Sequence, residues 1–397
     1  MNELNDFLGW LAEAWDEDLS MSEWWKRLAD AGFATPTWPV EVGGRGWESA
    51  AAKAVRDELR RRSIPGPAGG LGMMLAAPTI LAHGTLAQQL ELLPGIANGQ
   101  QNWCQLFSEP GSGSDLASLR TRATPVEGGW LINGQKVWTS NGHLADLGML
   151  LARTDAASSG RRGIAWMAID MHQPGIDVRP LREMTGRSLF TEVFLDGAFV
   201  RDDAVVGGPG SGWAAARTTL ASERIGLSEG GAVTLPPGAK GGFLDRRAGD
   251  VAAQLGQRRR PSGTSLAMRG RAWSAIEPVA STAGLHRDQQ LRCVRLAELE
   301  RVAELMQRRA AGDTAFGSTY PSLGKLLHSR QVRLARDTAS DASGLSLVAY
   351  DDADQASDLR ELVMFAPAVS IYGGSDEIQK NLIAERLLGL PRDSATS

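Results

Sequence analysis

The sequence of 397 residues predicts an α+β protein of three parts: an N-terminal α-helical domain, a middle β barrel or sandwich, and a C-terminal helical bundle. The period of the apolar residues supports this order. It is helical up to about residue 102, changes to two, and becomes helical again from about residue 212. We therefore expect domains at 1–102, 103–208 and 209–397, and a chain of this length allows two or three of them.

The N-terminal part carries two signals for the start of a helix. Ser20-Met21-Ser22-Glu23 has the spacing of a capping box, and Gly32 is placed to end the helix that follows. Thr85-Leu86-Ala87-Gln88 is a second capping box. Residues 47–62 between them form a charged amphipathic pattern, so this part is expected to be helical throughout.

The middle part consists of short apolar segments between turn residues. Asn133-Gly134 favours the turn of a two-residue hairpin, so residues 130–132 and 135–138 are expected to pair as antiparallel strands. Asp196-Gly197 is a second hairpin signal. Further strands are expected at Leu147 to Arg153, Gly163 to Asp170, Ile176 to Arg179 and Phe190 to Leu195.

The C-terminal part begins with a helix that carries Glu223 and Arg224 at the two margins of its apolar stripe. Periodicity does not decide which of the two faces the interior. Residues 229–285 have no clear pattern, whereas 289–310 form a strongly helical segment. The last helix is expected to open at Ser375-Asp376-Glu377, where a capping hydroxyl precedes two acidic residues.

Composition and charge exclude several functions. The net charge of −4 gives the chain no general attraction for nucleic acid or an anionic membrane, and the basic run Arg258-Arg259-Arg260 is expected in a solvated loop. The uncharged run 63–82 contains prolines and glycines that interrupt a membrane helix. Cys104 and Cys293 show no disulfide or metal spacing, and the N-terminus lacks a secretion signal. We therefore expect a cytoplasmic protein without a metal site.

Two neighbouring motifs point to a bound ligand. The segment FSEPGSGSD, residues 107–115, is a turn of small residues whose N–H groups and hydroxyls can approach an anionic or carbonyl-rich ligand. In NGQKVWTSNG, residues 133–142, Trp138 offers a flat ring beside the hydroxyls of Thr139 and Ser140. This combination suits a planar heteroaromatic group, although a Gly/Ser turn beside a core tryptophan would show the same residues.

The two motifs together resemble the flavin-binding middle domain of the acyl-CoA dehydrogenase family, and the order α, β, α extends the resemblance over nearly the whole chain. The resemblance implies an FAD whose isoalloxazine stacks on Trp138, with Thr139 and Ser140 at its N5 edge. Gly113 and Ser114 would lie near the pyrophosphate and the incoming thioester. The other cofactor-binding residues that we expect are Gln105, Phe107, Ser108, Ser375 and Glu377.

The resemblance also implies a carboxylate that removes the α proton of the substrate. Many members of the family carry it in a Tyr-Glu-Gly-Thr sequence, but here Gly373 follows Tyr372 and cannot take a proton. A minority carries it in a Leu-x-x-Glu-Arg sequence, which residues 220–224 match. We therefore expect Glu223 to be the base, with a solvated or ion-paired Glu223 as the alternative and Asp376 or Glu377 as weaker candidates.

Four residues are expected to contact the substrate. The backbone N–H of Gly373 would donate to the thioester carbonyl, and Ser114, Tyr372 and Arg224 would contact the substrate. The expected reaction is α,β-dehydrogenation of an acyl-CoA or acyl-carrier thioester, with electrons passed to an electron-transfer flavoprotein. The alternatives are a subunit without its own turnover, an oxidase of the same fold, and a DNA-associated relative that the acidic balance disfavours.

The resemblance implies an oligomer as well. Many relatives hold a neighbour's flavin with Arg-x-x-Phe-Gly and Gln-x-x-Gly-Gly sequences, which here are reduced to Arg271-Ala272-Trp273 and to residues 341–344. Ile383-Ala384-Glu385-Arg386 and the residues after it resemble a bacterial branch that acts on steroid or polycyclic thioesters, often as heteromeric pairs. We therefore expect a homo-oligomer, or a heteromer with a related subunit. The sequence does not identify the acyl group.

Overall fold

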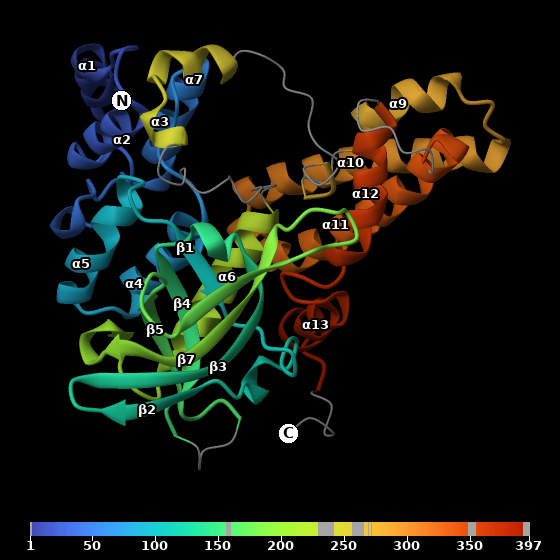
Figure 1. Ribbon diagram of the computed structural model, residues 1–397. Coiled ribbons are helices and arrows are strands. Elements are labelled where there is room, and N and C mark those ends of the chain that lie inside the picture. Colours follow the sequence, from blue (N-terminus) through green and yellow to red (C-terminus); the bar gives the residue numbers. More distant parts are fainter. Residues whose placement is uncertain are drawn as a thin grey trace. The chain divides into compact units, whose positions relative to one another are not determined.

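Figure 1 shows the computed structural model. The residues that it describes are 2–155, 160–228, 242–255, 266–268, 270, 272–347 and 355–391. They form two compact units. The first contains the described residues of 1–182, 188–219 and 233–259, and the second contains those of 183–187, 220–232 and 260–397. The basic run 258–260, expected in a loop, lies outside the described residues, as does Arg271.

The first unit begins with a set of helices built on the expected capping signals. The side chains of Ser20 and Thr85 each accept a hydrogen bond from the backbone N–H three residues later. The side chain of that later residue accepts a hydrogen bond from the backbone N–H of Ser20 or Thr85. Both capping boxes are therefore confirmed. The helices are α1 (Asn2–Ala14), α2 (Met21–Asp30), α3 (Ser49–Arg61), α4 (Ala77–His83), α5 (Leu86–Ala97) and α7 (Ala248–Leu255).

A core rich in aromatic rings holds these helices together. Phe7 of α1 packs edge-on against Phe33, and Trp24 of α2 lies between Trp10 and Trp15. The buried indole of Trp24 donates to the carbonyl of Pro65 at 2.7 Å, so its one polar group is satisfied. None of the helices in the described part of the chain has the length and hydropathy to cross a membrane.

The middle of the chain forms one eight-stranded sheet with the order β6-β7-β3-β2-β4-β5-β8, and β1 pairs with β4. Pairing is antiparallel except between β1 and β4 and between β2 and β4. The strands expected at 147–153, 163–170 and 176–179 are confirmed. The strands are β1 (Trp103–Leu106), β2 (Arg122–Val126), β3 (Gly129–Ser140), β4 (Leu147–Arg153), β5 (Ile164–Asp170), β6 (Ile176–Leu181), β7 (Phe190–Arg201) and β8 (Val205–Val206).

Both predicted hairpin turns are wrong. Asn133-Gly134 lies inside β3 and Asp196-Gly197 inside β7, and these two long strands pair with each other and shift register at this point. Gly197 has a φ of 70°, and its N–H donates to Oδ1 of Asn133 at 3.0 Å, as in a glycine bulge. A Cβ at Gly134 would lie 2.5 Å from the hydroxyl oxygen of Thr121. Gly197 therefore forms part of a bulge, and Gly134 allows the backbone to pass close to Thr121.

The described helices from residue 212 onward confirm the expected C-terminal helical part. α6 (Gly212–Ser228) contributes residues 212–219 to the first unit and its remaining residues to the second. In the second unit, α11 packs against α9, α10, α12 and α13. The helices of this unit are α9 (Trp273–Thr282), α10 (Arg287–Gly312), α11 (Thr314–Ser343), α12 (Gln355–Val369), α13 (Asp376–Leu382) and a π-helical turn, η8 (Ile383–Leu387).

Candidate active site

The turn between β1 and β2 is fixed by a buried ion pair. Nζ of Lys136, on β3, lies 2.8 Å from the carboxylate of Glu109 in the turn, and the two side chains are 0% and 7% exposed. Lys136 also donates to the carbonyl of Phe107, and Glu109 accepts from the N–H groups of Arg120 and Thr121. Burial lowers the pKa of Lys136 to about 8. Burial alone would raise the pKa of Glu109, but Lys136 and the N–H donors outweigh it and lower that pKa.

The tip of this turn is open. Glu109 and Ser112 exchange backbone hydrogen bonds of 2.8 and 3.0 Å, which close the loop behind Pro110-Gly111. Gly113 and Ser114 follow on the exposed side, and a Cβ at Gly113 would meet no atom within 4 Å. The turn is thus rigid at its base and accessible at its tip, as a site for an extended anionic ligand requires.

Trp138 has an unusual backbone for a large residue. Its φ is 61°, in the left-handed region, at a place where β3 shifts register against β7 between Lys136 and Thr139. The indole is 61% exposed and packs edge-on against Phe190, with ring centroids 5.9 Å apart. A β-bulge therefore turns this ring out of the sheet, and strain of this kind is typical of ligand sites.

The neighbours of Trp138 differ in accessibility. Thr139 is fully buried, and its hydroxyl has no hydrogen-bond partner among the described residues. Ser140 is half-buried. The hydroxyl of Ser140 is therefore the more accessible of the two, and Thr139 and Ser140 both remain proposed partners for a flavin edge. Gln105 and Ser108 are also half-buried, whereas the ring of Phe107 is buried.

Glu223 and Arg224 lie in the part of α6 that belongs to the second unit, and both are half-buried. Burial lowers the pKa of Arg224, and Arg386 lowers it further, while Glu223 acts in the opposite direction. Burial also raises the pKa of Tyr372, and the Glu223 carboxylate adds to this shift. The hydroxyl of Tyr372 has no hydrogen-bond partner in the described part of the chain. The second unit therefore groups a carboxylate, a guanidinium and a buried phenol.

Gly373 lies in the turn between α12 and α13. It has a φ of 66° and Gly374 a φ of 82°, a backbone conformation that favours glycine at both positions. Nε2 of Gln379 donates to both glycine carbonyls, at 3.0 and 3.4 Å. Among the described residues, no acceptor receives the N–H of Gly373. A donor role toward a ligand stays a proposal for this N–H.

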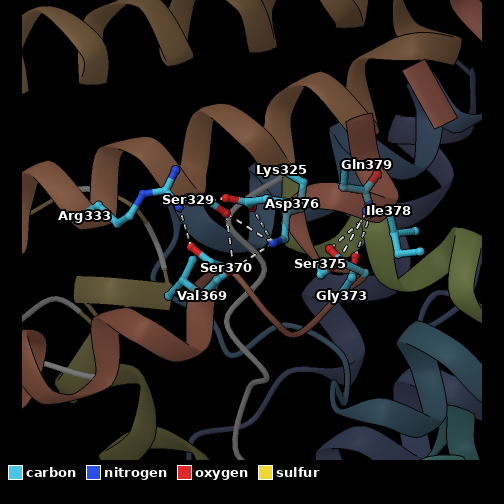
Figure 2. A network of polar contacts seen from close by, with 11 residues as sticks. Lys325, Ser329, Arg333, Val369, Ser370, Gly373, Ser375, Asp376, Ile378 and Gln379 are labelled. Atoms are coloured by element: carbon cyan, nitrogen blue, oxygen red, sulfur yellow. Dashed lines mark hydrogen bonds and ion pairs between the residues drawn. The ribbon is translucent and has the colours of Figure 1, made fainter. Parts of the chain in front are cut away.

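A cluster of charged side chains lies at the end of the same turn (Figure 2). The buried carboxylate of Asp376 lies 3.2 Å from Nζ of Lys325 and 2.8 Å from Nη1 of Arg333. Burial would raise the pKa of Asp376, but donors from α11 outweigh this and lower it. Asp376 is therefore held ionised for pairing, which disfavours it as a catalytic base. Ser375 caps α13 through the N–H of Ile378, and Glu377 is exposed.

Family models match three segments of the chain: the acyl-CoA dehydrogenase N-terminal domain at residues 5–100, the middle domain at 104–197 and the C-terminal domain at 275–388. The chain is 36% identical to acyl-CoA dehydrogenase IpdE1 of Mycobacterium tuberculosis, and the match covers 94% of this chain and 88% of that protein. The chain belongs to the acyl-CoA dehydrogenase family.

One relative in the family is about twice as long as the segment that it shares with this chain. Acyl-CoA dehydrogenase FadE34 of M. tuberculosis is 39% identical, and the match covers 92% of this chain but only 46% of FadE34. The solved structures of the ChsE4-ChsE5 complex from M. tuberculosis and of the Tcur3481-Tcur3483 steroid ACAD each have a TM-score of 0.69 at 23% identity. These two matches each cover 94% of this chain, and 90% and 89% of the respective structures. They establish the likeness of fold.

The residues of this chain whose chemistry fits FAD are the exposed ring of Trp138, the open tip at Gly113 and Ser114, and the accessible hydroxyl of Ser140. The ion pairs of Lys136 with Glu109 and of Lys325 and Arg333 with Asp376 were not expected from the sequence. β3 also carries Asn133, Gln135, Thr139 and Ser140, so no local pattern marks Lys136 as a buried charge that needs a partner.

Proposed function

We propose that this chain is an FAD-dependent acyl-CoA dehydrogenase that converts an acyl thioester to the trans-2-enoyl thioester. The observation that carries the proposal is the outward-turned Trp138 at a strained bulge, beside an open turn of small residues, in a member of this family. FAD, when bound, supplies the acceptor for the β hydride. The chain supplies the base, the donors for the thioester oxygen and the orientation of the substrate.

In this proposal Glu223 removes the α proton. Its half-buried place in the second unit, near Tyr372 and Arg224, supports the assignment, because the carboxylate lies close to two groups proposed to bind the substrate. The N–H of Gly373 donates to the thioester oxygen and stabilises the negative charge that develops there. Ser114, Tyr372 and Arg224 bind the substrate. Gln105, Phe107, Ser108, Ser375 and Glu377 remain proposed cofactor contacts.

Anaerobic mixing of the purified protein with acyl-CoA thioesters tests this function. A substrate is expected to bleach the absorbance of the bound flavin at about 450 nm, because hydride transfer reduces the flavin. A chain that binds flavin and thioester without bleaching would instead be a non-catalytic subunit. Oxygen consumption during turnover would indicate an oxidase.

The base is tested by Glu223→Gln, which removes the proton acceptor and keeps the shape of the side chain. We expect flavin content to be retained and the rate of flavin reduction to fall roughly 10²- to 10⁴-fold. Glu277→Gln, at an exposed position on α9 outside the proposed site, is the matched control and should keep the reduction rate within a few-fold. An unchanged rate in Glu223→Gln would remove Glu223 from the mechanism.

We propose a bulky acyl group, such as a steroid-derived one, as the substrate class. The resemblance of residues 383–392 to the steroid and polycyclic branch supports this, as do neighbours that include a structure named as a steroid ACAD. Reduction of the flavin by straight-chain and steroid side-chain CoA thioesters, compared at equal concentration, tests it. Faster reduction by the straight-chain compounds would contradict the proposed class. Rapid reoxidation by an electron-transfer flavoprotein would support that protein as the electron acceptor.

We further propose that the protein associates through α10 with a second copy of itself. Four apolar side chains on this helix are 43–53% exposed. In the sequence, two of them precede Glu298 and two follow it at the same spacings. Around the axis of the helix, the four lie within an arc of about 80°. The four are Leu291, Val294, Val302 and Leu305. A twofold axis at Glu298 would place each apolar residue of one helix against its counterpart on an antiparallel copy.

Light scattering and cross-linking test this assembly. Glu298→Cys should form a disulfide-linked dimer on mild oxidation, because the residue on the axis meets itself. Val294→Cys is the matched control and should not, because its counterpart is Val302. The native Cys104 and Cys293 are both buried, so the unmodified protein should give no cross-link. A monomer in light scattering that gains flavin only with a related subunit would favour the heteromer instead.

A further inference from the structure

We propose that Asp376, Lys325 and Arg333 position the turn between α12 and α13, and with it the N–H of Gly373 and the phenol of Tyr372. This inference rests on the proposed function of those two groups. Asp376 is then a positioning residue of the thioester site, acting through the backbone of the turn. The three side chains are called the α11 clamp below.

The α11 clamp holds both ends of the turn (Figure 2). Lys325 and Arg333 lie eight residues apart on one face of α11, with Ser329 between them. At the end of α12, Lys325 donates to the carbonyl of Val369 at 2.7 Å and Arg333 to the hydroxyl of Ser370 at 2.8 Å. At the start of α13, both cations pair with the carboxylate of Asp376, as described above.

A backbone hydrogen bond closes the turn across its base. The N–H of Asp376 donates to the carbonyl of Ser370 at 3.1 Å, so the residues between them form a short loop whose two ends are tied together. The charges also suit the helix ends, because Lys325 lies at the C-terminus of α12 and Asp376 in the first turn of α13. The clamp therefore stabilises both helix ends together with the loop.

The loop needs this support because of its own composition. Gly373 and Gly374 both have positive φ and no side chain to pack, so their intrinsic preference for one conformation is weak. Gln379 fixes their carbonyl groups, but the position of the whole loop on the second unit depends on the α11 clamp. A displacement of about 1 Å in a reacting group can reduce a rate on the order of 10²-fold.

The test uses the full-length protein with bound FAD and the variant Asp376→Asn, which leaves Lys325 buried without its counter-charge. We expect flavin reduction by a thioester to slow about 10- to 100-fold, with the KM changed only a few-fold, because orientation is lost while most substrate contacts remain. Hydrogen–deuterium exchange of the peptide 368–379 should become faster.

Asp341→Asn is the matched control. Asp341 pairs with Arg292 at 2.6 Å between α10 and α11, in the same unit but outside the turn. We expect this variant to lose stability without a change in the reduction rate or in exchange at 368–379. Arg333→Gln, at a half-exposed position, provides a milder variant if Asp376→Asn does not fold, and Arg333→Lys should restore part of the rate.

Equal reduction rates in Asp376→Asn, Arg333→Gln and Asp341→Asn would overturn the positioning role, as would unchanged exchange at 368–379. Failure of the proposed function is distinguishable from this outcome. In that case the wild-type protein would show no flavin reduction with any thioester, while the exchange measurement would still report whether the clamp holds the turn.

Discussion

Two turns that carry proposed ligand contacts are each supported by a buried lysine and a carboxylate. In the first unit Lys136 and Glu109 hold the turn of Gly113, and in the second Lys325 and Asp376 hold the turn of Gly373. The buried fractions are nearly the same, with the lysines 0% and 1% exposed and the acids 7% and 6%. In both cases the turn itself contains flexible glycines, and the buried charge pair holds the residues next to them.

The two pairs differ in how the charges are shared. Among the residues that the structure describes, Glu109 has one cationic partner, and its other donors are the backbone N–H groups of Arg120 and Thr121. Asp376 is shared by Lys325 and by the half-exposed Arg333. A buried carboxylate that loses its only cation is far less stable than one that keeps a second. The first turn is therefore expected to be the more fragile of the two.

The largest expected effect is that of Lys136→Met. It removes the cation that pairs with Glu109 in the described part of the chain, and should lower the free energy of unfolding by about 3–5 kcal/mol, with loss of bound flavin. Chemical denaturation and flavin absorbance measure the two effects. The double variant Lys136→Met/Glu109→Gln, which has no buried charge left, should recover part of the stability. No recovery would show that the ion pair is not the cause.

Folding stability is expected to depend on pH through His328, which lies on α11 near Lys325. Burial lowers the pKa of His328 from its usual 6.5 to about 4, and the charge of Lys325 makes a smaller contribution in the same direction. Between these values the unfolded chain binds more protons than the folded one, so stability should fall as the pH falls from 6.5 to 4, by about 3 kcal/mol in all. His328→Gln should abolish this dependence. The free energy of unfolding is measured by urea denaturation between pH 4 and 6.5. If it depended on pH in His328→Gln as it does in the wild type, the prediction would be contradicted.

Lys325→Met tests the comparison directly. Asp376 keeps Arg333, so the loss should be about 2 kcal/mol, smaller than that of Lys136→Met measured in the same way. Arg333→Gln in the Lys325→Met background should then cost more than Arg333→Gln alone, because the carboxylate has lost both cations. If Lys325→Met destabilised the protein as much as Lys136→Met, sharing of the charge would not explain the difference between the turns.

The smallest expected effect on stability is that of Trp138→Asn. Asparagine tolerates the left-handed conformation that strains Trp138, while the contact with Phe190 is lost. These changes oppose each other, so the free energy of unfolding should change by less than about 1 kcal/mol. Flavin affinity should nevertheless fall, because the stacking ring is gone. A large loss of stability would indicate that the ring supports the fold.

The sequence alone determined the order of the parts and many local features. The capping boxes at Ser20 and Thr85 and the strand at 147–153 follow from neighbouring residues, so sequence reasoning predicted them correctly. That the residues around Gly113 form a turn was also readable, because glycine, serine and proline are the residues that turns favour.

Only the tertiary structure decided the features that depend on distant residues. Asn133-Gly134 predicts a hairpin when read locally, but its strand has partners on both sides, and pairing with β7 converts the signal into a bulge. Lys136 and Glu109 are 27 residues apart, and Lys325 and Asp376 are 51 apart. A charge pair forms where the fold brings two buried groups together, and no local propensity encodes that meeting. The sequence thus determined the glycine turns themselves, whereas the fold determined which buried charges hold them in place.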